Sequence, residues 1–341
     1  MALIAAALVL AGAGNSLEDD LCAIARQAEL PGLGVAVVTS GGMEWSFYYG
    51  VKKSGEDSKV DGSTRWHLGS CTKAMTAAVV CGLAEEGKVD LSAPLAKDFP
   101  EVKVDSGYRD VTLRHLLAHQ SGMVPNVNWS SFKGGLAEAR LAAVRQLLVT
   151  PPASEVGKFT YSNAEVVVAG AAAERVMGKS IENLLTAEYA KIGIRDFGFG
   201  PTRKGETWPH IEGKPVAGNY DNAPVMTAAG RANMTLPDWG KWISEILKGL
   251  EGKETVLPES YFREIIKPPL GGNYAMGWVL DSRPWADGAC YWHNGSNTMN
   301  YCVVWVAPNK DRAVLVVTNT GGSKVGKAAD DCVAAVIKSL K

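Results

Sequence analysis

Ser70 and Lys73 stand three positions apart at the start of a predicted helix. Residues i and i+3 are neighbours on a helix, with Cβ atoms about 5–6 Å apart, so the Lys73 amine can reach the Ser70 hydroxyl. A lysine can act as the base for a serine when burial or nearby cations lower its pKa. The pattern therefore predicts a serine nucleophile with a lysine base. Ser130 and Lys133 share the spacing, and a helix cap beside a surface lysine is the alternative interpretation.

A phenol and a carboxamide open another predicted helix at Tyr161 and Asn163. A phenolate beside a lysine could accept the proton of a nucleophile and pass it to a leaving group, and the amide could orient Lys73 or a substrate. The alternative is a half-buried tyrosine with an asparagine that caps the helix. Tyr220 and Asn222 have the same spacing.

His293, Asn294 and Gly295 lie near the end of a predicted strand. A glycine there lets a substrate approach the backbone closely. The next residue, Ser296, could supply a second backbone N–H group to an oxyanion site. An ordinary strand end is the alternative, since such triplets recur easily.

Two further patterns favour a structural explanation. Residues 321–327 fit a phosphate-binding loop as far as Lys327, but Ala328 stands where such a loop needs Ser or Thr for Mg²⁺. His115 and His119 share a helix face, yet the Glu expected after the first histidine is missing and no third ligand is apparent. The sequence therefore predicts neither a nucleotide site nor a metal site. It also has no Gly-x-Ser-x-Gly motif, which argues against an α/β-hydrolase.

The elements that must position these groups form a simple order along the chain. A helix is predicted after Ser16, a hairpin over residues 33–49 and a helix from Ser70 to near Gly87. Helices dominate the middle, and strands return before a last helix. The expected later helices are 111–119, 136–149, 163–177, 181–190, 237–250 and 324–340, and the expected later strands are 275–280, 289–294, 301–306 and 312–318.

Strands at both ends of the chain with helices between them predict an α+β fold. We expect a mixed or antiparallel sheet flanked by helices, with an inserted helical domain. Residues 15–89 and 268–341 would form the sheet domain and residues 90–267 the helical domain. The candidate site would lie in the cleft where the two domains meet.

Composition excludes several functional classes. The 341-residue chain is 46% hydrophobic and 21% charged, which suits a sizeable core and excludes a disordered chain. Its 35 Lys and Arg against 36 Asp and Glu give a net charge of −1. This balance disfavours a nucleic-acid or anionic-membrane binder, so a small molecule is the expected partner and nucleic acid is not.

The first 14 residues form an apolar leader. They are too few for a membrane span, which needs about 20 residues, but they suit the core of a secretory signal that ends at Ala11-Gly12-Ala13. We therefore expect export to the periplasm or medium and no stable membrane span. The usual basic n-region is missing, and an apolar extension that stays attached is the alternative.

Five stretches, taken together and in order, resemble the serine β-lactamase and penicillin-binding-protein superfamily in its class C-like branch. That branch also holds D-alanyl-D-alanine carboxypeptidases, D-aminopeptidases and family VIII carboxylesterases. The resemblance covers nearly everything after the leader and implies a β-lactamase/transpeptidase-like fold. The stretches are residues 31–38, 67–73, 111–122, 159–163 and 291–295.

The resemblance implies acyl transfer through an acyl-Ser70 intermediate followed by hydrolysis, with no cofactor. Lys73 and Tyr161 would be the proton-handling pair, and the backbone N–H groups of Ser70 and Ser296 the oxyanion hole. The other implied substrate-binding positions are Asn163, His293, Asn294 and Gly295.

The third motif departs from the dedicated β-lactamases, which usually have Lys where this chain has His293. A histidine is only partly charged near neutral pH, so a substrate carboxylate would be held less firmly. We therefore expect a serine hydrolase of small esters or amides. The alternatives are a D-alanyl-D-alanine carboxypeptidase or weak β-lactamase, and a non-catalytic binding protein of the same fold.

Six cysteines are too few for a disulfide-built fold. Cys22 and Cys332 fall on the first and last predicted helices, which pack side by side in the resembled fold. A bridge between them is possible in an exported protein, and two free thiols are the alternative.

Overall fold

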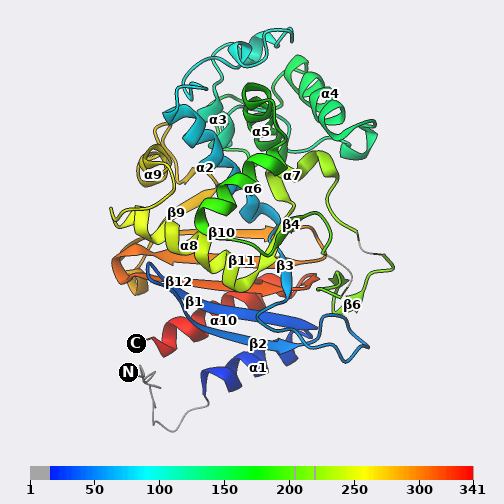
Figure 1. Ribbon diagram of the computed structural model, residues 1–341, viewed down its shortest axis with the longest axis vertical. Helices are drawn as coiled ribbons and strands as arrows, with labels where there is room; N and C mark the ends of the chain where they lie inside the picture. Colours follow the sequence, from blue (N-terminus) through cyan, green and yellow to red (C-terminus); the bar gives the residue numbers. More distant parts are fainter. Residues whose placement is uncertain (1–15, 203–204, 219, 341) are drawn as a thin grey trace.

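The computed structural model describes residues 16–202, 205–218 and 220–340. A seven-stranded antiparallel sheet lies at its centre, in the order β2-β1-β12-β11-β10-β9-β8 (Figure 1). Both ends of the chain build this sheet, because β1 pairs with β12. The predicted α+β fold is therefore confirmed. The strands are β1 (Gly32–Thr39), β2 (Gly42–Gly50), β8 (Tyr274–Ala275), β9 (Trp278–Arg283), β10 (Gly288–Ser296), β11 (Tyr301–Ala307) and β12 (Arg312–Thr318).

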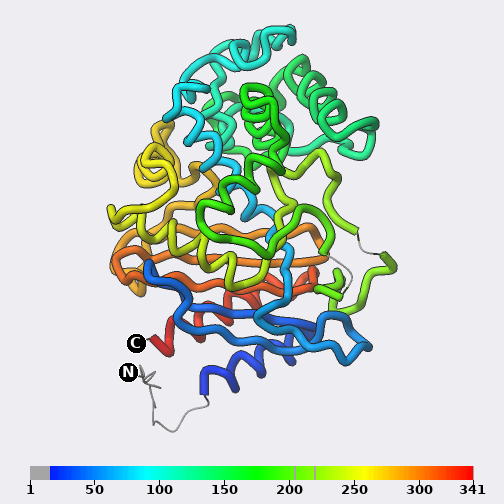
Figure 2. The backbone as a smooth tube through the Cα atoms, in the orientation of Figure 1, coloured from blue at the N-terminus to red at the C-terminus, as the bar shows by residue number. Residues whose placement is uncertain are grey.

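Two helices, α1 (Leu17–Gln27) and α10 (Val325–Ser339), pack together over one face of the sheet. Figure 2 shows the blue and red ends of the chain side by side there. Ser16 begins α1 with a capping box, as its side chain accepts a hydrogen bond from the Asp19 N–H group. Strand β1 is buried on both faces, because Val35 packs with these helices and Ala36 with the opposite core.

Helix α8 covers the other face of the sheet, and the remaining helices lie beyond it on that side (Figure 1). Helix α8 packs against β1, β2 and β12, although it lies in the stretch predicted as the helical domain. The division into domains stays a prediction. The helices are α2 (Thr72–Glu85), α3 (Leu113–Leu117), α4 (Leu136–Val149), α5 (Asn163–Met177), α6 (Ile181–Ile192), α7 (Thr227–Gly230), α8 (Leu236–Leu250) and α9 (Glu259–Ile266).

Helix α2 is buried on almost every side, where it contacts α5, α6, α7 and α9. Its residues are mainly Ala, Val, Met and Leu, as expected for a helix inside a core. Lys73 lies in the first turn of this helix. The fold therefore removes the Lys73 amine from bulk water.

Two small sheets complete the described chain. One joins β3 (Arg65–His67) and β4 (Phe197–Phe199) to β7 (Ala232–Thr235) between them, and so links the approach to Ser70 with the segment after α7. The other is formed by β5 (His210–Ile211), β6 (Lys214–Pro215) and β13 (Thr320–Gly321).

Two predicted elements differ from the structure by more than the one or two residues seen at other ends. The helix expected over 111–119 is only α3, because Thr112 caps it and His119 adopts a positive φ of 56° after it. The strand expected over 275–280 is divided into β8 and β9, since Met276 and Gly277 turn the chain with φ of 53° and 86°.

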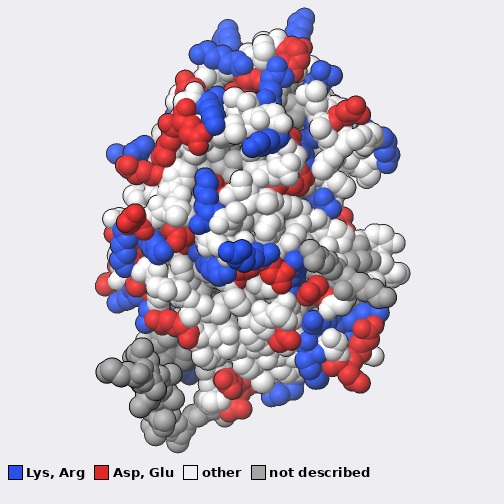
Figure 3. Space-filling view, in the orientation of Figure 1, with Lys and Arg blue, Asp and Glu red and all other residues white. Residues whose placement is uncertain are grey.

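The structure also bears on the expectations about a disulfide, a leader and a membrane span. All six cysteines are free thiols, so the possible bridge between Cys22 and Cys332 is not formed. The predicted leader lies outside the described residues. No described helix combines the length and apolarity that a membrane crossing requires. On the face shown in Figure 3, positive and negative side chains intermingle.

Candidate active site

Ser70 lies in a single 3₁₀ turn, η1 (Gly69–Cys71), between β3 and α2. Gly69 has a positive φ of 46°, and a Cβ atom there would lie 2.4 Å from the Ser296 nitrogen. On the facing strand, a Cβ atom at Gly295 would lie 2.0 Å from the Leu68 carbonyl oxygen. The two glycines therefore let the Ser70 turn pack directly against the end of β10, backbone to backbone.

Gly295→Ala tests this close packing. We expect a loss of about 1–3 kcal/mol in the free energy of unfolding, because the obstructing atom is a backbone oxygen that cannot rotate away. Urea unfolding measures the change. Gly41→Ala is the matched control, since its Cβ would be 3.5 Å from the nearest side-chain atom, and it should cost less than about 0.5 kcal/mol. Equal midpoints for the two variants would contradict the prediction.

The Lys73 ammonium group contacts three oxygen atoms. Its Nζ lies 3.0 Å from Ser70 Oγ, 2.7 Å from Asn163 Oδ1 and 2.7 Å from the carbonyl oxygen of Ala229. Only 1% of the residue is exposed, and none of these partners carries a negative charge. Burial therefore lowers the pKa of Lys73 to about 7, although a Cys71 thiolate would oppose this shift. Near neutral pH a large fraction of Lys73 is an uncharged amine that can accept a proton.

Tyr161 completes the group around Ser70. Its ring lies 4.9 Å from Lys73 Nζ, measured to the ring centroid. Burial raises the pKa of the Tyr161 phenol well above its ordinary value, while a hydrogen bond with Ser70 acts in the opposite direction. The residue is still 36% exposed, so a ligand can reach it. Tyr161 is consequently protonated at neutral pH and available as a proton donor.

The second predicted motif opens a helix as expected. Ser162 caps α5, and its side chain accepts a hydrogen bond from the Glu165 N–H group. Asn163 follows in the first turn and donates from Nδ2 to Asn126 Oδ1 over 3.0 Å. Because this bond fixes the amide, its Oδ1 faces Lys73. The structure thus brings Asn163 to the lysine.

Only some residues of the third predicted motif, His293-Asn294-Gly295, lie at the site. The His293 ring is buried, lies 6.1 Å from the Tyr161 ring and contacts the Tyr274 hydroxyl through Nε2 at 3.2 Å. The Asn294 side chain points to the other face of β10 and donates to the Tyr301 hydroxyl over 3.0 Å. The structure therefore does not bring the Asn294 amide to Ser70.

A buried network behind Tyr161 was not predicted. His119 packs against the Tyr161 ring, with centroids 4.6 Å apart, and its Nδ1 lies 2.7 Å from Glu165 Oε2. Burial lowers the pKa of His119 and raises that of Glu165 to about 8, so burial favours the uncharged form of each group. The only sequence signal was a Glu on the apolar side of α5.

A second hydrogen-bonded network that the sequence did not predict supports the Ser70 turn. The Gly69 N–H group donates to His67 Nδ1 over 3.0 Å, and His67 Nε2 lies 2.8 Å from Asp221 Oδ1. Asp221 also pairs with Arg231. Asp221 is the middle residue of the second Tyr-x-Asn pattern, whose Tyr220 is 61% exposed. That pattern therefore supplies a buried support for the turn.

The histidines of the possible metal pattern and the serine of the second Ser-x-x-Lys pattern contact other protein groups. The ring of His115 contacts the Thr112 hydroxyl at the start of α3, whereas His119 contacts Glu165. Ser130 lies in a separate 3₁₀ turn at Trp129–Ser131 and contacts Asn128. Within the described residues, no group of three or more His, Cys, Asp or Glu side chains is placed to hold a metal ion.

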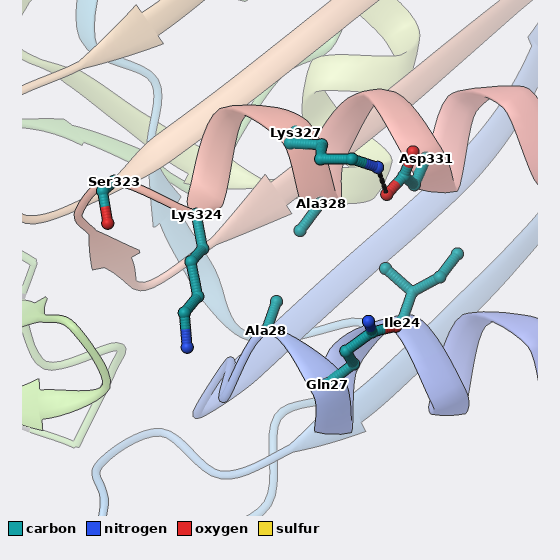
Figure 4. Close-up of a pocket in the computed structure, with 8 residues that line it drawn as sticks. All are labelled: Ile24, Gln27, Ala28, Ser323, Lys324, Lys327, Ala328 and Asp331. Carbon is teal, nitrogen blue, oxygen red and sulfur yellow. Dashed lines mark hydrogen bonds and ion pairs between the residues drawn. The ribbon is translucent and has the colours of Figure 1, made fainter.

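The glycine-rich turn before α10 borders a hollow of about 460 Å³ between α1 and α10 (Figure 4). Its two lysines already face carboxylates, since Lys327 pairs with Asp331 at 2.5 Å and Lys324 with Glu29 at 3.2 Å. The hollow lies across the sheet from α2. It therefore has no part in the Ser70 site.

A family profile described as Beta-lactamase matches residues 17–337. The chain belongs to the beta-lactamase family. The superfamily expected from the sequence is thus confirmed. This beta-lactamase family generally contains hydrolases that work by serine acyl transfer.

The curated proteins that this chain resembles have low sequence identity to it. Protein flp of Staphylococcus aureus (strain COL) is 22% identical, with 92% of this chain and 64% of that protein covered. Unguisins hydrolase ungD' of Aspergillus campestris is 24% identical, with 90% of this chain and 62% of that protein covered. The chain therefore spans less than two thirds of the length of these relatives.

Two solved structures share the fold of this beta-lactamase family chain. The octameric penicillin-binding protein homologue from Pyrococcus abyssi has a TM-score of 0.76 at 22% identity, with coverage of 94% of this chain and 77% of that chain. SurE with D-Leu has a TM-score of 0.77 at 21% identity, with coverage of 95% and 74%.

Proposed function

We propose that this chain is a serine hydrolase that transfers acyl groups from small esters or amides to water through an acyl-Ser70 intermediate. One observation carries the proposal. Lys73 Nζ lies 3.0 Å from Ser70 Oγ in a buried position that lowers the pKa of the amine to about 7. A base with a pKa near the working pH is the most effective proton acceptor for a serine hydroxyl.

The contacts support the following sequence of steps. Uncharged Lys73 takes the Ser70 proton while Oγ attacks the substrate carbonyl carbon. The backbone N–H groups of Ser70 and Ser296 stabilise the oxyanion, which is consistent with the packing of η1 against the end of β10. Tyr161 donates a proton to the leaving group as the tetrahedral intermediate collapses, and protonated Lys73 returns the Ser70 proton to Tyr161, so both groups regain their starting states. Water then attacks the acyl-serine, and the same groups return its proton to Ser70.

Labelling with an activated phosphonate tests the nucleophile directly. We expect a single phosphonyl adduct in the intact mass, located on Ser70 by peptide mapping and missing in Ser70→Ala. Hydrolysis of p-nitrophenyl acetate or butyrate should stop as the adduct forms. A protein that neither accepts the label nor hydrolyses these esters would instead be the non-catalytic binding protein.

The pH dependence of hydrolysis follows from the lowered pKa of Lys73. Because the base must be uncharged, kcat/KM for a neutral ester should rise with pH through a limb near 7. A pH–rate profile from pH 5 to 9 measures it. The limb should persist in Glu165→Gln and Cys71→Ser, which remove other groups that titrate nearby. A rate that falls from pH 6 to 8 would contradict Lys73 as the base.

A second candidate function is a D-alanyl peptidase or weak β-lactamase. It is supported by the fold shared with a penicillin-binding protein homologue and with SurE, whose structure contains D-Leu. A fluorescent penicillin distinguishes the cases. A lasting adduct on Ser70 would favour a penicillin-binding type, rapid turnover a β-lactamase, and the absence of both an esterase or amidase.

His293→Lys tests whether the histidine at this position lowers the preference for substrates that carry a carboxylate. A fixed ammonium near Tyr161 should attract a substrate carboxylate, so we expect the kcat/KM ratio of carboxylate-bearing to neutral esters to rise about fivefold or more. Paired esters that differ in this one group measure it. His115→Lys, a substitution at the start of α3, is the control. An unchanged ratio would show that His293 does not set this preference.

A further inference from the structure

Two thiols meet directly behind the Ser70 turn. Cys71, the residue after the candidate nucleophile, has its sulfur 3.5 Å from the sulfur of Cys302 on β11. The two residues are 231 positions apart in the sequence. Neither thiol has a role in the proposed hydrolysis. Their contact is therefore a feature that the hydrolytic mechanism does not explain.

The surrounding packing holds the two sulfur atoms together. Cys302 lies opposite Gly295 in the β10–β11 register, and a Cβ atom at Gly295 would come within 2.9 Å of the Cys302 sulfur. Cys302 also donates to the Leu68 carbonyl oxygen over 3.2 Å. Cys71 is 4% exposed and Cys302 0%. The packing therefore holds the two sulfur atoms in contact.

The electrostatics give the two thiols different reactivities. Burial alone would raise the pKa of the Cys71 thiol, but its contacts with Cys302 and His293 lower that pKa below the ordinary value. Burial raises the pKa of Cys302 well above its ordinary value. Cys71 also keeps 4% of its surface exposed, whereas Cys302 is fully buried, so we assign the attacking thiolate to Cys71 and the resolving thiol to Cys302.

We propose that Cys71 and Cys302 form a reversible oxidation site, in which hydrogen peroxide or a small alkyl hydroperoxide converts the pair to a disulfide and switches off the adjacent Ser70. The proposal rests on the contact and its position. Its consequence for hydrolysis rests on the proposed function, but formation of the disulfide does not.

The chemistry balances in two steps. The Cys71 thiolate attacks one peroxide oxygen, the O–O bond breaks, and the leaving hydroxide takes up a proton to become water; an alkyl hydroperoxide instead releases an alkoxide that becomes the alcohol. Cys302 sulfur then attacks the sulfenic acid of Cys71 and loses its proton, the S–S bond forms, and a second water leaves. Two electrons pass from the sulfur atoms to the peroxide. The protein loses two hydrogen atoms.

We expect closing the bond to displace the Ser70 turn. A disulfide requires a sulfur separation of about 2.05 Å, so the two atoms must approach by about 1.5 Å from their 3.5 Å contact. Ser70 is bonded to Cys71, and its Oγ would shift relative to Lys73 Nζ. A displacement of about 1 Å in a catalytic group can lower a rate by about 10²-fold.

The test treats the purified full chain with hydrogen peroxide, followed by rapid quenching of free thiols with iodoacetamide. We expect an intact mass lower by two hydrogens before alkylation, and a Cys71–Cys302 cross-linked peptide after digestion. Hydrolysis of p-nitrophenyl butyrate should fall by about 10²-fold and return with dithiothreitol. Both changes should be missing in Cys302→Ser and in Cys71→Ser.

Cys290→Ser is the matched control, because Cys290 is a fully buried thiol on β10 that packs with Ala286 and Ala307. It should form the disulfide and lose activity as the parent chain does. A parent chain that keeps both thiols under peroxide, or gains oxygen without losing hydrogens, would overturn the proposal. So would a disulfide that leaves ester hydrolysis unchanged. If the chain forms the disulfide but never hydrolyses esters, the proposed function fails and the oxidation site stands.

Discussion

Ser70→Ala is expected to lower kcat/KM for p-nitrophenyl esters by at least about 10³-fold. Among the described groups that contact Lys73, this hydroxyl is the one that can form an ester bond with the substrate. Its loss removes the covalent route, and the backbone N–H groups alone would leave only residual catalysis. Initial rates with p-nitrophenyl butyrate measure the effect, with circular dichroism to show that the variant is folded.

Ser130→Ala is the matched control for this substitution. Ser130 has the same spacing to a lysine, but it lies in a separate turn where its hydroxyl contacts Asn128. Its loss should change kcat/KM by less than about twofold. Equal rates for Ser70→Ala and the parent chain would end the assignment of Ser70 as the nucleophile.

Lys73→Met should lower kcat by about 10²–10⁴-fold, which is the usual contribution of a positioned general base. Methionine fills a similar volume inside α2, so the core is preserved. Two acceptors, Asn163 Oδ1 and the Ala229 carbonyl, lose their donor, and we expect about 1–3 kcal/mol of destabilisation for each. Single-turnover kinetics and thermal unfolding measure the two effects separately.

Lys73→Arg separates proton transfer from simple electrostatics. A guanidinium keeps the positive charge but stays protonated, so it cannot accept the Ser70 proton. We expect Lys73→Arg to be nearly as slow as Lys73→Met, while Lys133→Met, at the exposed lysine of the second Ser-x-x-Lys pattern, remains near the parent rate. Recovery of more than about a tenth of the parent kcat in Lys73→Arg would contradict the role of base.

The elements around the site could be predicted closely because they depend on neighbouring residues. Helix α5 begins at Asn163 and ends at Met177 as predicted, since Ser162 caps it and Gly178 ends it in the left-handed conformation. The turn at Met276 and Gly277 was missed because no pattern marks a positive φ at a methionine.

The candidate site could be predicted from the sequence only in part. Ser70, Lys73, Tyr161 and Asn163 were expected, and the structure brings them together. The partners of Asp221 and Glu165 were missed, because each lies close to its histidine only after folding. The Asn294 side chain was expected beside the substrate, but strand alternation turns it toward Tyr301.

The sequence by itself determined what a single helical turn or strand pair enforces: the contact of Ser70 with Lys73, the cap at Ser162 and the hairpin of β1 and β2. Only the tertiary structure decided which oxygen atoms meet the Lys73 amine, how deeply it is buried and which thiol faces Cys71. The physical reason is that spacing fixes local geometry, whereas a pKa and a long-range contact depend on surrounding atoms. Those atoms come from α5, α7 and β11, far away in the chain.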